Sequence, residues 1–294
     1  MALTKIRIFG LIKMGRPFVL VAGLLAYLVG ISIAYGEIKS IDSSKAVFGF
    51  ILMISGTLMA HYLDEYADID TDSITRRTLY SGGSGVLPSG IVPTNWAIYS
   101  AFFFLIVTLT IMFISIYTKI LSPIIILIVI PALFGGWIYS MPPFSLERKG
   151  LGEVDNAILG GFFMTLIGYS AQTGTITFNS ILSLIPIFLA VFVNLLGVHW
   201  SDRTADEFVG KLTIAVRLGG ETRFLFYFLV FLTYFFTFLL IGKVITFKVG
   251  IFILLTIPFG VYCSYKFTKT KTPMLSSAFM ALIMLSMIFG NFLD

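Results

Sequence analysis

The chain has 294 residues, of which 57% are hydrophobic and 12% are charged, and its mean hydropathy is +0.97. This composition excludes a soluble globular domain and indicates a protein that crosses a membrane several times. The lipid bilayer is therefore an expected partner and nucleic acid is not. The single cysteine, Cys263, excludes an internal disulfide.

Nine apolar stretches are long enough to span a hydrocarbon core of about 30 Å. The first follows a basic segment that ends at Arg16-Pro17, which we interpret as an interfacial anchor with the proline starting the helix. The sequence thus predicts an all-α polytopic membrane protein whose nine transmembrane helices surround a central cavity. The expected spans are 17–36, 46–65, 95–117, 121–140, 154–171, 180–200, 222–242, 248–267 and 273–292.

Charged residues favour one side of the membrane. With the N-terminus in the cytoplasm, 15 of the 20 Lys and Arg residues fall on the cytoplasmic side or at the adjoining helix ends. Of the 15 acidic residues, only Glu37, Asp42 and Asp294 fall on the opposite side. The positive-inside rule therefore predicts an integral protein of the cell membrane, with the N-terminus and the active face in the cytoplasm.

Two acidic clusters occur where the second and sixth predicted spans end. They run from Asp64 to Asp72 and from Asp202 to Asp206, and each contains D-x-x-x-D, the spacing that stacks two carboxylates on one helix face. At a separation of about 5 Å and an effective dielectric of about 20, such a pair repels by about 3 kcal/mol. The negative end of the helix dipole adds to this cost. Bound divalent cations would offset it, whereas two solvated helix ends are the alternative interpretation.

The clusters lie at equivalent helix ends, four spans apart, which indicates an internal duplication. We expect a single membrane-embedded domain over 1–294. Its two four-helix halves would cover about 1–145 and 146–272, with a ninth helix at 273–294.

At these clusters the sequence resembles the UbiA superfamily of intramembrane prenyltransferases. The first motif of that family, N-D-x-x-D-x-x-x-D, matches Asp64, Glu65, Asp68 and Asp72. Its second motif, D-x-x-x-D with a following G-K-x-T, matches Asp202, Asp206, Gly210, Lys211 and Thr213. The chain departs from the first motif by having Asp in place of the leading Asn and Glu in place of the following Asp.

A loop between the motifs resembles one branch of the superfamily. Residues 139–146 read Y-S-M-P-P-F-S-L, and residues 148–153 read R-K-G-L-G-E. These segments are similar to a loop of the 1,4-dihydroxy-2-naphthoate polyprenyltransferases, the menaquinone-pathway branch. The resemblance implies transfer of a polyprenyl group from an allylic diphosphate, such as geranylgeranyl diphosphate, to that aromatic acceptor.

The resemblance also implies Mg²⁺ as cofactor, with two ions expected. Carboxylates would hold Mg²⁺ against the diphosphate, where it acts as a Lewis acid while the C–O bond breaks. The expected metal ligands are Asp64, Asp68, Asp72, Asp202 and Asp206.

Other residues in the same loops are expected to complete the site. For the diphosphate these are Arg76, Arg77, Lys211 and Arg217, each with a solvated charge as the alternative interpretation. The ring of Tyr139 is expected to stabilise the allylic cation, although an interfacial aromatic is equally in keeping with its position. Candidates for orienting the acceptor or removing its proton are Arg148, Glu153 and His199. For His199, a hydrogen-bonded structural role is the alternative.

Two further functions remain open. The same chemistry could act on 4-hydroxybenzoate, haem, homogentisate or a glycerol-phosphate ether. A cation-coupled transporter also has repeats and intramembrane acids, but its ionisable groups should lie near the middle of the bilayer. Here they lie at helix ends, which favours the enzyme.

Overall fold

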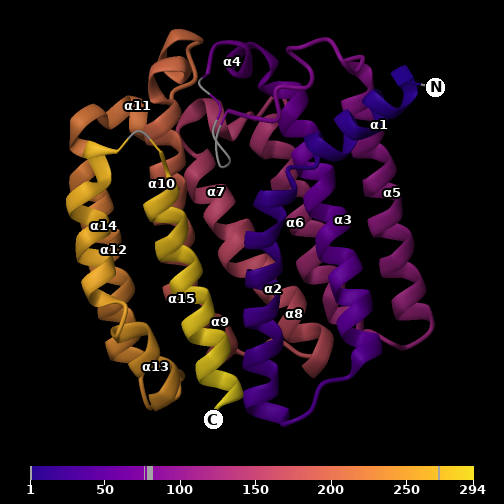
Figure 1. Ribbon diagram of the computed structural model, residues 1–294. Helices are drawn as coiled ribbons and strands as arrows, with labels where there is room; N and C mark the ends of the chain where they lie inside the picture. Colours follow the sequence, from indigo (N-terminus) through magenta and orange to yellow (C-terminus); the bar gives the residue numbers. More distant parts are fainter. Residues whose placement is uncertain (1, 76, 78–81, 271) are drawn as a thin grey trace.

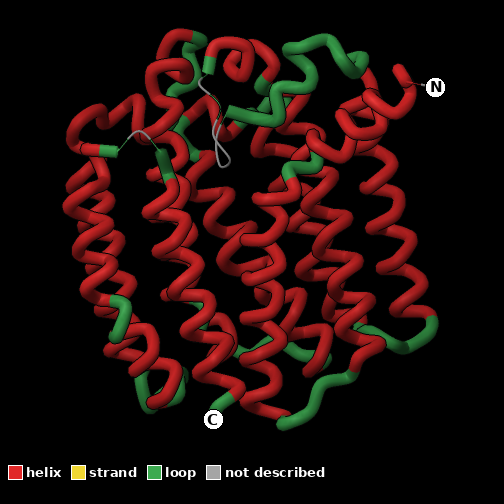
Figure 2. Tube along the Cα trace, in the orientation of Figure 1, coloured by secondary structure: helices red, strands yellow, loops and turns green. Residues whose placement is uncertain are grey.

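The computed structural model describes residues 2–75, 77, 82–270 and 272–294, and its regular elements within these ranges are all helical (Figures 1 and 2). The α-helices of the first half are α1 (Ala2–Met14), α2 (Pro17–Ile38), α3 (Ser43–Ala67), α4 (Ile69–Ile74), α5 (Asn95–Tyr117) and α6 (Ile126–Ser140). Those that follow are α7 (Gly152–Ile158), α8 (Met164–Thr173), α9 (Phe178–Leu182), α10 (Ile185–Phe208), α11 (Ile214–Leu218), α12 (Thr222–Leu240), α13 (Phe247–Leu254), α14 (Ile257–Lys266) and α15 (Met274–Phe292).

Within the described residues, eight helical segments are long and apolar enough to cross a membrane. They are Pro17–Ile38, Ser43–Ala67, Asn95–Tyr117, Pro123–Ser140, Phe178–Phe208, Ile214–Leu240, Phe247–Lys269 and Met274–Phe292. Each contains or overlaps one of the predicted spans. The remaining predicted span, 154–171, is helical from Gly152 to Thr173, but it is built from α7, the π-helical segment η3 (Leu159–Phe163) and α8.

Glycines allow the central helices to pack closely. A Cβ atom added at Gly30 of α2 would lie 1.9 Å from the carbonyl oxygen of Thr165 in α8. One added at Gly168 of α8 would lie 2.2 Å from the carbonyl oxygen of Tyr27 in α2. The backbones of α2 and α8 therefore touch at this crossing, as small residues permit in membrane helix pairs.

The surface of the bundle is apolar where it would meet lipid. Many Phe side chains of the outer helices are exposed, including Phe103 and Phe113 of α5 and Phe231 and Phe238 of α12. Between helices, polar side chains bond to one another: Thr108 donates to the Ser55 hydroxyl at 2.7 Å, which links α5 to α3. An apolar surface around a core in which polar side chains pair across helices is the pattern of an integral membrane protein.

One end of the bundle carries most of the short elements. Figure 1 shows α1, α4 and α11 gathered at the end where the N-terminus lies, whereas the C-terminus lies at the other end. The helix α3 ends here at Ala67, and Asp68 alone separates it from α4. The long helix α10 ends at the same side and is followed by the turn that contains Lys211. Both acidic clusters therefore lie at one end of the molecule, which we call the site end.

Candidate functional site

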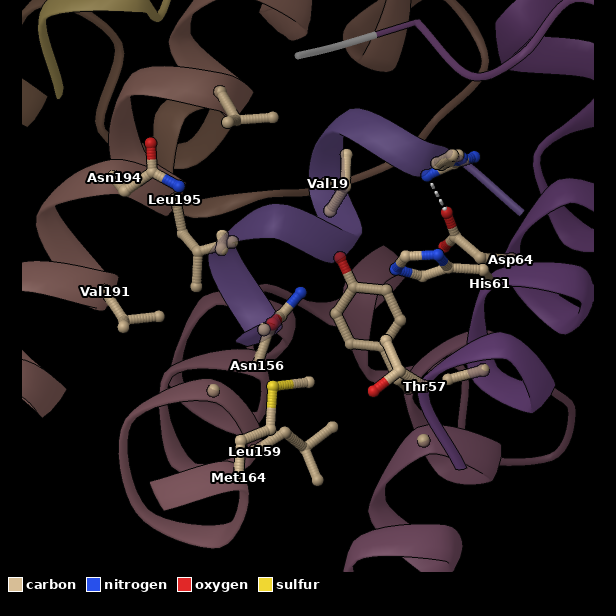
Figure 3. Close-up of a pocket in the computed structure, with 18 of the residues that line it drawn as sticks. Val19, Thr57, His61, Asp64, Asn156, Leu159, Met164, Val191, Asn194 and Leu195 are labelled. Carbon is tan, nitrogen blue, oxygen red and sulfur yellow. Dashed lines mark ion pairs between the residues drawn. The ribbon is translucent and has the colours of Figure 1, made fainter. Parts of the chain in front are cut away.

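A cavity of about 590 Å³ lies inside the bundle between α2, α3, α6, α8, α10 and α15. Figure 3 shows His61 and Asp64 on one side of this cavity and Asn194 on the opposite side. Its wall also includes Phe18 of α2 and Met274 of α15, whose side chains are 62% and 61% exposed. The cavity therefore reaches the outer surface of the bundle between the ends of α2 and α15.

Most of the wall is apolar, and acidic side chains gather at the site end. The lining includes eight of the residues predicted for the site: Asp64, Asp68, Asp72, Tyr139, His199, Asp202, Asp206 and Lys211. The two acidic clusters, which are far apart in the sequence, thus share one cavity.

Asp64 of α3 and Asp68, which directly follows α3, already have basic partners. Nη1 of Arg16 lies 2.6 Å from Oδ2 of Asp64, and the Ser140 hydroxyl donates to Oδ1 of the same carboxylate at 3.1 Å. Nζ of Lys211 lies 2.7 Å from Oδ2 of Asp68 and 3.0 Å from its Oδ1. Two basic residues from distant parts of the chain therefore neutralise this face of α3.

The last carboxylate of the cluster, Asp72, is buried beneath the loop that contains Gly82, Gly83 and Gly85, which we call the glycine loop. A Cβ atom added at Gly83, where φ is 58°, would lie 1.6 Å from Oδ2 of Asp72. This oxygen is buried and has no hydrogen-bond partner in the part of the chain that the structure describes. Burial raises the pKa of Asp72 to about 8, although the nearby Arg16 lowers it. A cation bound at Asp72 would have to displace a proton at neutral pH.

On α10, Asp202 and Asp206 face the same cavity. Asp206 is buried, and its Oδ2 has no hydrogen-bond partner among the described residues. Burying a carboxylate oxygen without a partner is costly unless a bound cation or ligand satisfies it. Asp206 therefore resembles Asp72 in having a buried oxygen that a bound cation would satisfy.

Glu147 is a site residue that the sequence analysis missed. Its Oε2 lies 2.7 Å from Nζ of Lys211, and its side chain is fully buried. Oxygen atoms of Asp64, Asp68 and Glu147 all lie within 4.8 Å of one another. Burial raises the pKa of Glu147 to about 8, although Lys211 lowers it. In the sequence Glu147 stands beside Arg148 and Lys149 and resembles an ordinary surface charge.

Arg16, interpreted from the sequence as an interfacial anchor, also bonds carboxylates of the site. Besides Asp64, it bonds Glu65 through Nε at 2.7 Å. Glu65 is buried, and it also accepts hydrogen bonds from the backbone N of Ser84 at 2.8 Å and from the Ser84 hydroxyl. Arg16, Glu65 and Ser84, which we call the Glu65 clamp, tie the start of α2 and the glycine loop to α3.

Glu153 and His199 form a second buried pair. Nδ1 of His199 lies 2.8 Å from Oε1 of Glu153, and that oxygen also accepts a hydrogen bond from the backbone N of Ile214 at 2.7 Å. Glu153 does not line the cavity, but His199 does. The pair thus connects α7, α10 and α11 behind one wall of the cavity.

Three other predicted basic residues bind backbone carbonyl groups. Arg148 donates to the carbonyl of Ala67 at 2.9 Å, Arg217 to those of Leu212 and Lys149, and Arg77 to that of Asp72 at 3.3 Å. None of these three arginines lines the cavity. Arg76 lies outside the described residues.

Solved structures share this fold. A UbiA homologue from Archaeoglobus fulgidus bound to GPP and Mg²⁺ is 15% identical, with a TM-score of 0.72 over 97% of this chain and 98% of that one. The apo structure of a UbiA homologue from Aeropyrum pernix K1 is 12% identical, with a TM-score of 0.70 over 92% and 97% of the two chains. A structure of digeranylgeranylglyceryl phosphate synthase is 17% identical, with a TM-score of 0.69 over the whole of both chains.

Sequence comparison gives the family directly. No curated protein sequence matches the chain. The sequence model of the UbiA prenyltransferase family, however, matches residues 23–289. That match includes both acidic clusters and most of each helix that lines the cavity. Because it extends over most of the sequence, the chain belongs to the UbiA prenyltransferase family, a family of intramembrane enzymes.

Proposed function

We propose that the protein transfers a polyprenyl group from an allylic diphosphate to a hydroxylated aromatic acceptor, 1,4-dihydroxy-2-naphthoate. The observation that carries this proposal is the shape of the cavity: its acidic end is joined to an apolar interior that opens between α2 and α15. A donor with a charged head and an isoprenoid tail has the same two-part chemistry. Membership in a family of enzymes also decides against the transporter considered above.

The acidic end suits Mg²⁺. All the candidate donors are carboxylate oxygens, which Mg²⁺ prefers, and those of Asp72 and Asp206 include buried atoms that lack hydrogen-bond partners among the described residues. The proposed ligands are Asp64, Asp68, Asp72, Asp202 and Asp206, with two ions expected. When bound, Mg²⁺ would bridge these carboxylates to the diphosphate and stabilise the charge that develops on it.

Among the basic residues, Lys211 is best placed for the diphosphate. Its ammonium group lines the cavity between Asp68 and Glu147. Its pKa is raised well above the usual value, because the attraction of nearby acidic groups, above all the Asp68 carboxylate, outweighs the effect of burial, so it remains charged. Arg16 also lines the cavity, whereas Arg148, Arg217 and Arg77 would act by holding the surrounding loops.

The rest of the cavity would protect the reactive cation. Ionisation of the donor leaves an allylic carbocation, which water would quench, so an apolar enclosure preserves it. Tyr139 lines the cavity at the end of α6, and its ring would stabilise the cation. The tail of a donor such as geranylgeranyl diphosphate would run along the apolar wall and leave between α2 and α15.

The acceptor is proposed from the loop at 139–153, which resembles that of the dihydroxynaphthoate enzymes. A glycerol-phosphate ether is the second candidate, because the digeranylgeranylglyceryl phosphate synthase matches over the full length of the chain. The asymmetry of basic residues supports the cell membrane as location, with the site end in the cytoplasm.

A turnover assay on purified protein in nanodiscs tests the proposal. It would contain geranylgeranyl diphosphate, Mg²⁺ and, in parallel, 1,4-dihydroxy-2-naphthoate, 4-hydroxybenzoate, homogentisate, haem and geranylgeranylglyceryl phosphate. We expect a prenylated naphthoquinol that disappears with EDTA and with Asp72→Asn. The matched control is Asp70→Asn, an exposed residue of the same helix α4 that does not line the cavity. Product with another acceptor would correct the substrate, and no transfer to any acceptor would refute the proposal.

A further inference from the structure

We propose that His199 is the base that takes the hydroxyl proton of the aromatic acceptor, and that Glu153 positions it for this task. This inference rests on the proposed function, since it needs an acceptor with a hydroxyl group.

The position of His199 gives one of its ring nitrogens to the protein and the other to the cavity. Its Nδ1 is 2.8 Å from Glu153, and its side chain lines the cavity one helical turn before Asp202. Nδ1 of His199 is a buried atom, which leaves Nε2 as the ring nitrogen toward the cavity. When Nδ1 carries the proton toward a carboxylate, Nε2 is the lone-pair nitrogen and accepts a proton.

The Glu153 side chain is fixed in place by its hydrogen-bond partners and by its burial. Its side chain is 0% exposed, and Oε1 is fixed both by His199 and by the backbone N of Ile214. Gly152, just before it, packs on the loop, since an added Cβ there would lie 2.6 Å from Cα of Glu147. A buried carboxylate in this arrangement orients an imidazole and stabilises the imidazolium that forms when the imidazole takes a proton.

The only other histidine of the chain gives the contrast. His61 stands three residues before Asp64, as His199 stands three residues before Asp202, and it too lines the cavity. Its Nδ1, however, lies 2.9 Å from the carbonyl oxygen of Gly15. A neutral carbonyl group fixes the ring without supplying the negative charge that would stabilise an imidazolium. His61 is therefore the matched control for a histidine that lines the site and does not act as a base.

The proposed step balances in atoms and charge. The allylic C–O bond breaks and its electron pair leaves with the diphosphate. An electron pair of the acceptor ring forms the new C–C bond, while the hydroxyl proton passes to Nε2 of His199 and the oxygen becomes a ring ketone. If the attacked carbon bears a carboxylate, loss of CO₂ returns its electron pair to the ring, and the oxygen regains the proton from His199. If it bears hydrogen, that proton leaves to solvent in place of CO₂, its electron pair returns to the ring, and the oxygen again takes the proton from His199.

The test compares His199→Gln, Glu153→Gln and His61→Gln on hydroxyaromatic acceptors whose ring fluorines make the hydroxyl progressively more acidic. General bases contribute roughly 10²- to 10⁴-fold, and this contribution shrinks as the substrate proton becomes more acidic. We expect His199→Gln to lose about 100-fold or more with the least acidic acceptor and to recover along the series. Glu153→Gln should show a smaller loss with the same trend. Any loss in His61→Gln should be the same for all acceptors.

A second measurement separates this role from a structural one. Without its base the enzyme should still ionise the donor, so the ratio of prenyl alcohol to prenylated product should rise at least tenfold in His199→Gln. Equal losses for all acceptors, or an unchanged ratio, would overturn the inference and leave the proposed function intact. If His199→Gln does not fold, His199→Asn and Glu153→Gln carry the same comparison. Failure of the wild-type protein to prenylate any hydroxyaromatic acceptor would overturn the proposed function, and this inference with it.

Discussion

The ends of α3 and α10 carry the same pattern, a histidine followed three and seven residues later by aspartates, in different surroundings. At the end of α3, the protein supplies its own cations, because Arg16 pairs with Asp64 and Lys211 with Asp68. At the end of α10, Asp206 is buried with an oxygen that lacks a hydrogen-bond partner among the described residues. The same pattern thus gives Asp64 and Asp68, which basic side chains of the protein neutralise, and Asp206, whose buried oxygen an added cation would satisfy.

The largest expected effect is on the α10 side. Metal stabilisation of the developing charge is worth several kcal/mol, so Asp206→Asn should reduce turnover by about 10³-fold or more. Asp64→Asn should reduce it by about 10- to 100-fold, because Arg16 already shares the charge of Asp64. Steady-state rates at saturating Mg²⁺ check both values. Equal losses of turnover for the two variants would show that the aspartates of α3 and α10 do not differ in their need for a bound cation.

The α3 side is expected to matter more for stability. Removing one partner of a buried charged pair costs about 3–5 kcal/mol, so Glu65→Ala should strongly lower the unfolding free energy by releasing the Glu65 clamp. The matched control is the half-exposed pair of Lys248 and Asp294 at 3.8 Å, where Lys248→Ala should change stability by about 1 kcal/mol or less. Denaturation in detergent followed by tryptophan fluorescence would measure both, and similar values would show that the clamp is not structural.

Glu147 gives a pH dependence of defined sign. Its pKa is about 8 in the folded protein, above its ordinary value of 4.5, so over this window the unfolded chain is ionised while the folded chain keeps the proton. The contribution to stability is therefore full below pH 4.5 and is lost as the pH rises toward 8. Unfolding midpoints in EDTA should fall between pH 5 and pH 8, and less steeply in Glu147→Gln. A wild-type and variant difference that is constant with pH would contradict this account.

The smallest expected effect concerns the loop arginines. Arg217 is exposed and binds two backbone carbonyl groups, so Arg217→Ala should raise the KM for the donor by about tenfold or less. Lys211→Ala should raise it more, because Lys211 lines the cavity. Donor titrations of the two variants would check this order, and the reverse order would place the diphosphate near Arg217.

The transmembrane helices were predictable from the sequence because an apolar stretch long enough to cross the membrane forms a helix there. The predicted span 95–117, for example, coincides with α5. The helix α1 was missed, because its sequence was interpreted only as a basic segment. Spacing along a helix placed the aspartates at the cavity. It could not reveal Glu147 or the Glu65 clamp, because their partners come from distant loops. The sequence also does not show where a basic side chain points. Arg148 and Arg217 bind backbone carbonyl groups rather than lining the cavity.

The central claim is that both acidic clusters hold a single complex of metal and diphosphate. Calorimetric binding of geranylgeranyl thiolodiphosphate, a donor that resists ionisation, tests it most directly when done with and without Mg²⁺. We expect the donor analogue to bind tightly only with Mg²⁺, and we expect this binding to be lost both in Asp68→Asn and in Asp206→Asn. Binding that is independent of Mg²⁺, or that survives the loss of either aspartate, would contradict it.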